Sequence, residues 1–234
     1  MTSDLDREAE RVRQVYARRA ERGLDARYAY WTPANLFIYQ SRERALLSLL
    51  RSEGMLPLSD RHVLDVGCGD GAVLQDCLRY GARVEDLSGV DLLADRVESA
   101  RARLPGATLE VGDGQSLPFE DARFDLVLGF TLLSSVLDDD GRRRLVIEML
   151  RVARPGGLIV LYDFWINPFN RDARPLKRDD VRSLFAGHTV EFRRTTLAPP
   201  ITRALAGLPG GWLACTMLGM IPFANTHYLA AIKV

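Results

Sequence analysis

The chain has 234 residues, 47% of them hydrophobic and 26% charged, which is typical of one globular domain with a sizeable core. Its 31 basic and 31 acidic residues cancel, and this zero net charge argues against a dedicated nucleic-acid-binding protein, which usually carries a basic excess. The three cysteines are scattered along the chain, so they predict neither a disulfide framework nor a metal site. We therefore expect a cytoplasmic protein without a metal ion.

Residues 1–60 are predicted to form a helical cap that belongs to the same domain as the rest of the chain. Residues 3–22 are highly charged and carry only a thin apolar stripe at helical spacing, without the apolar core of a signal peptide. An aromatic-rich stretch with a break at Pro33 follows. Apolar residues at helical spacing then predict a second helix over residues 41–53, which Gly54 ends.

Over residues 61–234, short apolar runs alternate with segments of helical spacing. The predicted strands are HVLDV, LSGVDLL, TLEVGD, FDLVLGF, LIVLYDF, TVEFRRTTL and HYLAAIKV. The predicted helices between them cover residues 71–80, 94–103, 139–153 and 177–187. Strands and helices that alternate in this way predict a doubly wound α/β fold, in which helices cover both faces of a mostly parallel sheet.

The segment 201–223 is an apolar insertion between the last two predicted strands, and no charged side chain follows Arg203 until Lys233. A membrane-spanning helix needs about 20 unbroken apolar residues. Prolines and glycines interrupt this stretch, so we expect no stable span. Three alternatives stay open: a lid over a hydrophobic acceptor, packing on the sheet or on a second copy in a homodimer, and a peripheral contact with lipid.

The strongest motif is VLDVGCGDG at residues 63–71, an apolar run that leads into three closely spaced glycines and a helix. Glycines in such a loop let the backbone approach a ligand closely. The third glycine follows the second by two residues, whereas the GxGxxG loop of nicotinamide and flavin enzymes spaces them by three. Asp65 ends the strand, where its carboxylate would repel a pyrophosphate but suits a ligand with an ammonium or sulfonium group.

Two more acidic residues are expected at the ends of the next two strands. Asp91 ends the second strand, where a carboxylate accepts hydrogen bonds from both hydroxyls of a ribose. Asp113 ends the third strand, where it can accept from an adenine amino group while the Gly114 backbone meets the ring. Ligands of doubly wound folds bind at the carboxyl ends of the strands, so the acids and the glycine loop predict a nucleoside site at that edge.

These motifs resemble those of the class I, Rossmann-like S-adenosylmethionine-dependent methyltransferases, and among them the small-molecule type. The resemblance is carried by VLDVGCGDG, GVDLL, GDGQSLPF, FDLVLGFTLL and LRVARPGGLIVLYDF, which cover roughly residues 60–165. It implies a seven-stranded sheet whose last strand is antiparallel to the others, and S-adenosyl-L-methionine as the cofactor. The cofactor-binding residues that it implies are Asp65, Gly67, Cys68, Gly69, Asp91, Leu92, Asp113, Gly114, Phe130 and Thr131.

One further cofactor contact follows from the resemblance. Many small-molecule members hold the cofactor carboxylate with a basic residue ahead of the first strand. Arg42 is the first candidate for this role and Arg44 the second, and the alternative is that both face solvent.

Methyl transfer from an activated cofactor needs mainly alignment, and it needs a base only where the nucleophile must lose a proton. Residues 132–135, after the fourth strand, lack the histidines that many relatives carry there. The candidates for a catalytic base are therefore His227, at the start of the last strand, and Asp163, at the end of the fifth. The alternative for both is an ordinary pairing within the fold.

The resemblance and the apolar insertion together predict a methyltransferase whose acceptor is a small hydrophobic or lipid-linked metabolite, such as a natural product, a quinone or a sugar. No NPPY-type tetrapeptide is present, which argues against adenine or glutamine N-methylation. Two alternatives stay open. One is a protein of this fold without methyl transfer, such as a cofactor binder or a cyclase, and the other is a methyltransferase of RNA or protein. We expect no nucleic-acid partner.

Overall fold

The computed structural model describes residues 4–21, 29–167 and 172–234. It contains a seven-stranded sheet with the strand order β3-β2-β1-β4-β5-β7-β6. The strands are β1 (Val63–Val66), β2 (Leu87–Asp91), β3 (Thr108–Val111), β4 (Phe124–Phe130), β5 (Ala153–Phe164), β6 (Thr189–Leu197) and β7 (Asn225–Lys233). Neighbouring strands are parallel except that β7 is antiparallel to both β5 and β6, as predicted.

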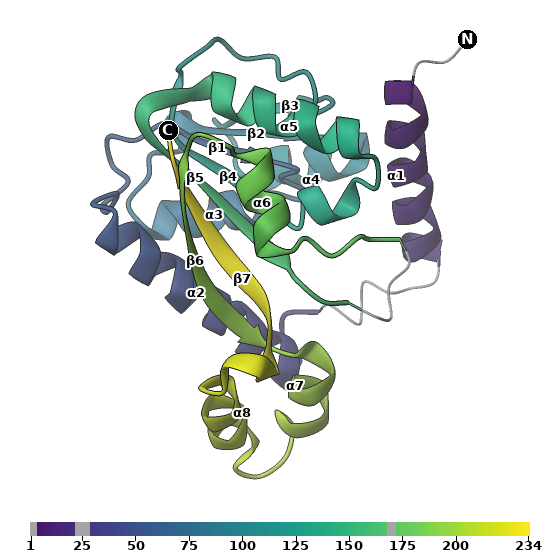
Figure 1. Cartoon of the computed structure of the whole chain (residues 1–234), viewed down its shortest axis with the longest axis vertical. Coiled ribbons are helices and arrows are strands. Elements are labelled where there is room, and N and C mark those ends of the chain that lie inside the picture. The colour runs from purple at the N-terminus through teal and green to yellow at the C-terminus, as the bar shows by residue number, and fades with distance from the viewer. Residues whose placement is uncertain (1–3, 22–28, 168–171) are drawn as a thin grey trace.

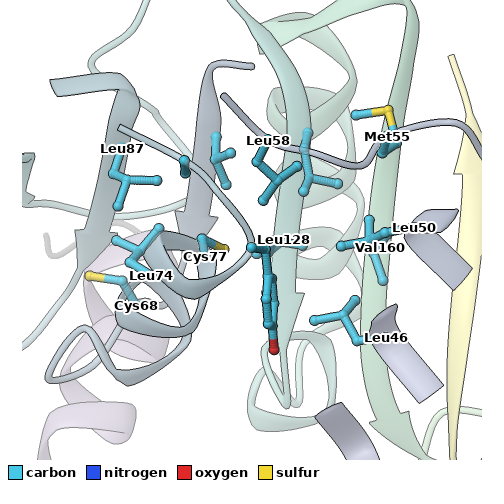
Figure 2. Close-up of a cluster of buried hydrophobic side chains, with 14 of the residues drawn as sticks. Leu46, Leu50, Met55, Leu58, Cys68, Leu74, Cys77, Leu87, Leu128 and Val160 are labelled. Atoms are coloured by element: carbon cyan, nitrogen blue, oxygen red, sulfur yellow. The ribbon is translucent and has the colours of Figure 1, made fainter. Parts of the chain in front are cut away.

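Helices cover both faces of this sheet (Figure 1). The five that follow the N-terminal helix α1 (Asp4–Glu21) and precede β6 are α2 (Pro33–Ser52), α3 (Ala72–Arg79), α4 (Ala94–Arg103), α5 (Asp139–Val152) and α6 (Arg178–Leu184). On one face α2, α3 and α4 contribute Leu46, Leu74 and Val97 to a buried cluster, part of which Figure 2 shows. On the other face α5 and α6 contribute Met149 and Val181. The doubly wound α/β prediction is confirmed.

Helix α2 begins at Pro33, well ahead of the start that apolar spacing predicted. Proline in the first turn of a helix loses no hydrogen bond, because the N–H groups there have no partner within the helix. The Thr32 side chain caps the helix by accepting from the Asn35 N–H at 3.4 Å. Pro33 therefore starts the helix instead of breaking it, and Arg42 lies in the middle of a long helix.

The insertion folds into α7 (Pro199–Leu205), α8 (Gly211–Gly219) and the short 3-10 turn η4 (Pro222–Ala224). We call residues 199–224 the apolar lobe. It projects from the ends of β6 and β7 (Figure 1) and packs on the start of α2 around Phe37 and Cys215. Among the described helices, none is long and apolar enough to cross a membrane.

A substitution of Gly89 in β2 tests how closely the glycine loop packs on the sheet. A Cβ added there would lie 2.8 Å from the Cys68 sulfur and 3.0 Å from a Leu109 methyl carbon. We predict that Gly89→Ala lowers the free energy of unfolding by about 1–3 kcal/mol, because a well-packed core resists added volume. Urea denaturation measures the change.

The control is Gly207→Ala, because a Cβ at Gly207 meets nothing within 4 Å and its backbone needs no positive φ. This variant should unfold within about 0.5 kcal/mol of the wild type. Equal stability of the Gly89 variant and the control would contradict the packing described for the loop.

Candidate functional site

The glycine loop between β1 and α3 has a backbone conformation that residues with a side chain rarely adopt. Gly67, Gly69 and Gly71 all have positive φ angles, of 76°, 53° and 78°. The N–H groups of Gly67 and Cys68 donate to the Val90 carbonyl oxygen at 2.7 and 3.0 Å. The loop is thereby tied to the end of the neighbouring strand β2, and glycine is required where the backbone is left-handed.

Asp91, the last residue of β2, is oriented by two backbone groups. Its Oδ2 accepts from the Gly69 N–H at 2.8 Å and its Oδ1 accepts from the Leu93 N–H at 3.0 Å. The carboxylate is half-buried and lines a cavity. Each carboxylate oxygen has a second lone pair, so Asp91 can still accept from a ligand.

The segment after β3 forms the next part of the site. Asp113 accepts from the backbone N–H of Gln115 at 2.9 Å and from its side-chain amide at 3.2 Å. A Cβ at Gly114 would lie 2.7 Å from Leu145 and 2.8 Å from Val66, so a larger residue does not fit. The absence of a side chain at Gly114 therefore lets the backbone pack directly on Leu145 and Val66 at the wall of the cavity.

These segments enclose a cavity of about 820 Å³ that is partly open to solvent. Its lining includes seven of the residues predicted from the sequence: Gly67, Asp91, Leu92, Asp113, Gly114, Phe130 and Thr131. The sequence analysis missed Arg96, Gln115 and the two α1 residues Val12 and Tyr16, which also line it. Val12 and Tyr16 lie four residues apart on the apolar stripe of α1, and that spacing was the available signal.

Helix α1 closes one side of this cavity. Arg11 donates to the Ser135 carbonyl oxygen at 2.5 Å, and the Arg96 guanidinium carbon lies 4.5 Å from the centre of the Tyr16 ring. Val12 and Val15 are buried. The N-terminal helix therefore covers the carboxyl edge of the sheet, as a cap would.

Asp65 is a buried acid with an unused oxygen. Its Oδ1 has no hydrogen-bond partner within the described part of the chain. Burial, with a smaller contribution from Asp91, raises the pKa of this carboxyl to about 8, although Arg42 opposes the shift. A buried polar atom without a partner is rare in folded proteins and indicates a position that a ligand donor would complete.

Arg42 is held among aromatic rings and not by carboxylates. Its guanidinium carbon lies 4.8 Å from the centre of Tyr39, 5.2 Å from Phe130 and 5.6 Å from Tyr162. It forms no ion pair with any residue that the structure describes, whereas Arg44 is exposed and donates weakly to Ser41. Of the two predicted arginines, Arg42 is the one on the side of Asp65.

His227, the predicted base on β7, lies in the same aromatic group. Its ring stacks on Tyr162 with centroids 5.1 Å apart, and its Nδ1 lies 3.0 Å from the Thr226 hydroxyl. Burial, and to a smaller extent Arg42, lowers the pKa of His227 to about 4. The imidazole is therefore neutral near pH 7 and has a nitrogen able to accept a proton.

Asp163 points away from this group, because neighbouring residues of a strand face opposite sides of the sheet. Its carboxylate accepts from the Ser134 N–H at 3.1 Å and from the Phe164 N–H at 2.9 Å. Burial raises its pKa to about 6 despite these bonds. Asp163 thus anchors the turn after β4, and the structure does not bring it together with His227.

Tyr162 is a further residue of this region that was not predicted from the sequence. Its hydroxyl lies 2.9 Å from the hydroxyl of Thr196, and burial raises its pKa to about 12. Thr196 has a φ of 63°, which is rare for a residue other than glycine. The pairs of β6 with β7 on either side of it, Thr195 with His227 and Leu197 with Asn225, keep the same register, so the unusual backbone of Thr196 is a local distortion within β6.

Part of the chain matches a known protein family. Residues 63–157 match a family model described as a methyltransferase domain. This part of the chain is similar to methyltransferase domains, and the whole chain has the class I methyltransferase fold. The resemblance predicted from the motifs is confirmed, and so is S-adenosyl-L-methionine as the cofactor of the family.

Two curated relatives share this domain. Norajmaline N-methyltransferase of Rauvolfia serpentina is 31% identical over 131 residues, which are 53% of this chain and 43% of that protein. The probable tRNA methyltransferase 9B of Bos taurus is 28% identical over 164 residues, which are 70% of this chain and 31% of that protein. The chain therefore spans less than half the length of either relative.

A solved structure shares the fold over the whole chain. The 1,6-didemethyltoxoflavin-N1-methyltransferase of Burkholderia thailandensis, solved with 1,6-didemethyltoxoflavin and S-adenosylhomocysteine, aligns with a TM-score of 0.65. The alignment covers 100% of this chain and 91% of that one at 17% identity. At this identity the likeness establishes the fold alone.

The raised pKa of Asp65 predicts an unusual dependence of stability on pH. Between about pH 4 and pH 8 the folded chain keeps the Asp65 proton while the unfolded chain loses it, so this group makes the fold less stable as the pH rises. We predict that Asp65→Asn, which cannot ionise, is more stable than the wild type at pH 8 by on the order of a few kcal/mol. The difference should nearly vanish at pH 4.

Urea denaturation of both proteins across this pH range measures the difference. Asp95→Asn, at an exposed position in the first turn of α4, is the control and should show no such trend. A difference between the Asp65 variant and the wild type that stays constant with pH would mean that Asp65 is ionised in the folded chain.

Proposed function

We propose that this protein transfers the methyl group of S-adenosylmethionine to a small acceptor that is hydrophobic or linked to a lipid. The observation that carries the proposal is the cavity at the carboxyl edge of the sheet, which the glycine loop, Asp91 and Asp113 line, with Asp65 buried in the neighbouring strand β1. When bound, the cofactor supplies a methyl group activated by a positively charged sulfur.

Each of the three acids has a distinct role in holding the cofactor. The Asp91 carboxylate, fixed by the Gly69 and Leu93 N–H groups, accepts from the ribose hydroxyls. Asp113 accepts from the adenine amino group, and Gly114 leaves room for the ring. The unpaired Oδ1 of Asp65 accepts from the cofactor ammonium group, which offsets the cost of ionising a buried acid.

Arg42 and its aromatic neighbours form the side of the site toward the reacting groups. The guanidinium, free of ion pairs among the described residues, holds the cofactor carboxylate. The faces of Tyr39 and Phe130 lie next to it and suit a positively charged sulfonium. The neutral His227 accepts the proton where the acceptor is a hydroxyl.

Three observations support a small acceptor over a nucleic acid. The net charge is zero, whereas RNA-binding surfaces are strongly basic. The apolar lobe follows the carboxyl end of β6 and therefore lies at the edge of the sheet where the glycine loop lies. Norajmaline N-methyltransferase and the toxoflavin enzyme are both named for small acceptors, although the tRNA methyltransferase 9B relative is not.

Binding of S-adenosylhomocysteine tests the cofactor site. We expect the wild type to bind it in the micromolar range, about −8 kcal/mol, by isothermal titration calorimetry. Asp91→Ala should weaken binding by about 100-fold, because two charge-assisted hydrogen bonds are lost.

Asp95→Ala, at an exposed position on the helix that follows, is the matched control and should bind like the wild type. Absence of binding by the folded wild type would contradict the proposed cofactor site. Equal binding by both variants would show that Asp91 does not contribute to cofactor binding.

Substitution of His227 tests the proposed base. His227→Gln keeps a hydrogen-bonding group of similar size but cannot take up a proton. With a hydroxyl acceptor, we predict that kcat falls by about 10²- to 10⁴-fold while the affinity for S-adenosylhomocysteine is unchanged. The wild-type kcat/KM should also show no loss from protonation of His227 until the pH approaches its pKa of about 4.

Transfer of labelled methyl groups and pH profiles with both proteins supply these data. An activity of the glutamine variant within a few-fold of the wild type would exclude a base at this position.

A further inference from the structure

Helix α8 and the turn η4 expose large apolar side chains. Leu213 is 67% exposed, Met217 62% and Phe223 81%. Other large apolar side chains exposed in the apolar lobe are Ile201, Leu208, Trp212, Met220 and Ile221. A helix that is apolar all round is normally buried or in contact with a membrane, and exposed apolar patches mark interaction surfaces.

The inner side of the lobe is well fixed, so the exposed side chains are not needed for folding. Cys215 of α8 is fully buried in a cluster with Phe37 of α2 and Leu197 of β6. The rings of Phe37 and Trp212 pack edge to face, with their centroids 5.6 Å apart. The Asn225 amide donates to the Gly219 carbonyl oxygen at 2.8 Å, which fixes the end of α8. The lobe is therefore anchored on its inner side and presents an apolar outer face.

The segments that form this face and the start of α2 beneath it carry basic but no acidic side chains. Residues 192–234 contain no aspartate or glutamate, and neither does the first half of α2, residues 33–42, on which the lobe packs. Arg194 lies beside η4, where it donates to a backbone carbonyl at 2.9 Å and its guanidinium carbon is 5.8 Å from the Phe223 ring centre. Arg203 is on α7. An apolar face with a basic rim complements a surface of apolar chains and anionic head groups.

We propose that the apolar lobe docks on an anionic lipid bilayer, with α8 and η4 at the level of the head groups. Helix α8 has nine residues, far fewer than the roughly 20 that cross a bilayer, so it lies in the plane of the interface. Arg194 pairs with the phosphates. A symmetric contact between two copies through this face would instead bring two basic rims together without an acidic residue to pair them.

Docking would have a consequence for access to the site. Strand β6 is parallel to β1 through β5, so the lobe that follows its last residue, Leu197, lies at the carboxyl edge of the sheet. That edge carries the glycine loop and the cavity. The site would face the bilayer from which a lipid-linked acceptor comes, although docking itself depends only on the surface and not on methyl transfer.

Co-sedimentation of the full chain with lipid vesicles tests docking without cofactor or acceptor. The vesicles are phosphatidylcholine alone and phosphatidylcholine mixed with anionic phosphatidylglycerol. The variant combines Met217→Glu and Phe223→Glu, which places two charges on the apolar face. The control is Ile147→Glu, an equally exposed apolar position on α5, at 61% exposure. Thermal unfolding confirms that each protein is folded.

We expect the wild type and the control to bind the anionic vesicles, and less so as salt is added. The double variant should lose about tenfold or more of this binding, because each glutamate replaces an inserted apolar group and repels anionic head groups. The proposal is overturned if the folded wild type binds neither vesicle, if it binds both equally, or if the double variant binds as the control does. A dimer that disappears in the double variant, without vesicle binding, would assign the face to a second copy.

Discussion

The hydrogen bond from the Gly69 N–H to the Asp91 carboxylate joins the glycine loop to the end of β2, and the rest of the site depends on it. The loop has three left-handed glycines and few side chains of its own, so contacts with β2 determine its position. The same bond points the Asp91 oxygens toward the cavity. One interaction therefore fixes both the position of the loop backbone and the orientation of the carboxylate that we propose as the acceptor for the ribose of the cofactor.

Two ionisable side chains near this loop, Asp65 and Arg42, have no partner of opposite charge among the described residues, and a zwitterionic ligand would supply one for each. Asp65 and Asp91 lie close enough that Asp91 helps to raise the pKa of Asp65, and Arg42 opposes that effect from α2. Arg42 is itself held by aromatic faces, so its positive charge is not neutralised by a neighbouring acid in the described chain. A zwitterionic ligand has an ammonium group for Asp65 and a carboxylate for Arg42, which matches the amino-acid end of S-adenosylmethionine.

Most of the fold could be predicted from the sequence, because strand and helix periodicities alternate clearly after residue 60. Asp91 and Gly114 both line the cavity, since strand ends of a parallel sheet share one edge, while their contacts with a cofactor stay a prediction. Tyr16 was missed because its place over the cavity depends on how α1 packs on distant strands. Asp163 was named as a base from its position at the end of a strand, but it faces the side of the sheet opposite to His227. Both faces of β5 are buried there, so its sequence has no alternation that tells which side a residue faces.

Transfer of the methyl group is the most direct test of the central claim. The purified chain is incubated with S-adenosylmethionine labelled in the methyl group, together with an organic-solvent extract of hydrophobic metabolites or with total RNA. The account predicts that label enters a compound of the organic extract and not the RNA, and that Asp91→Ala stops this incorporation. Tight binding of the cofactor without transfer to the extract, or transfer to RNA instead, would contradict it.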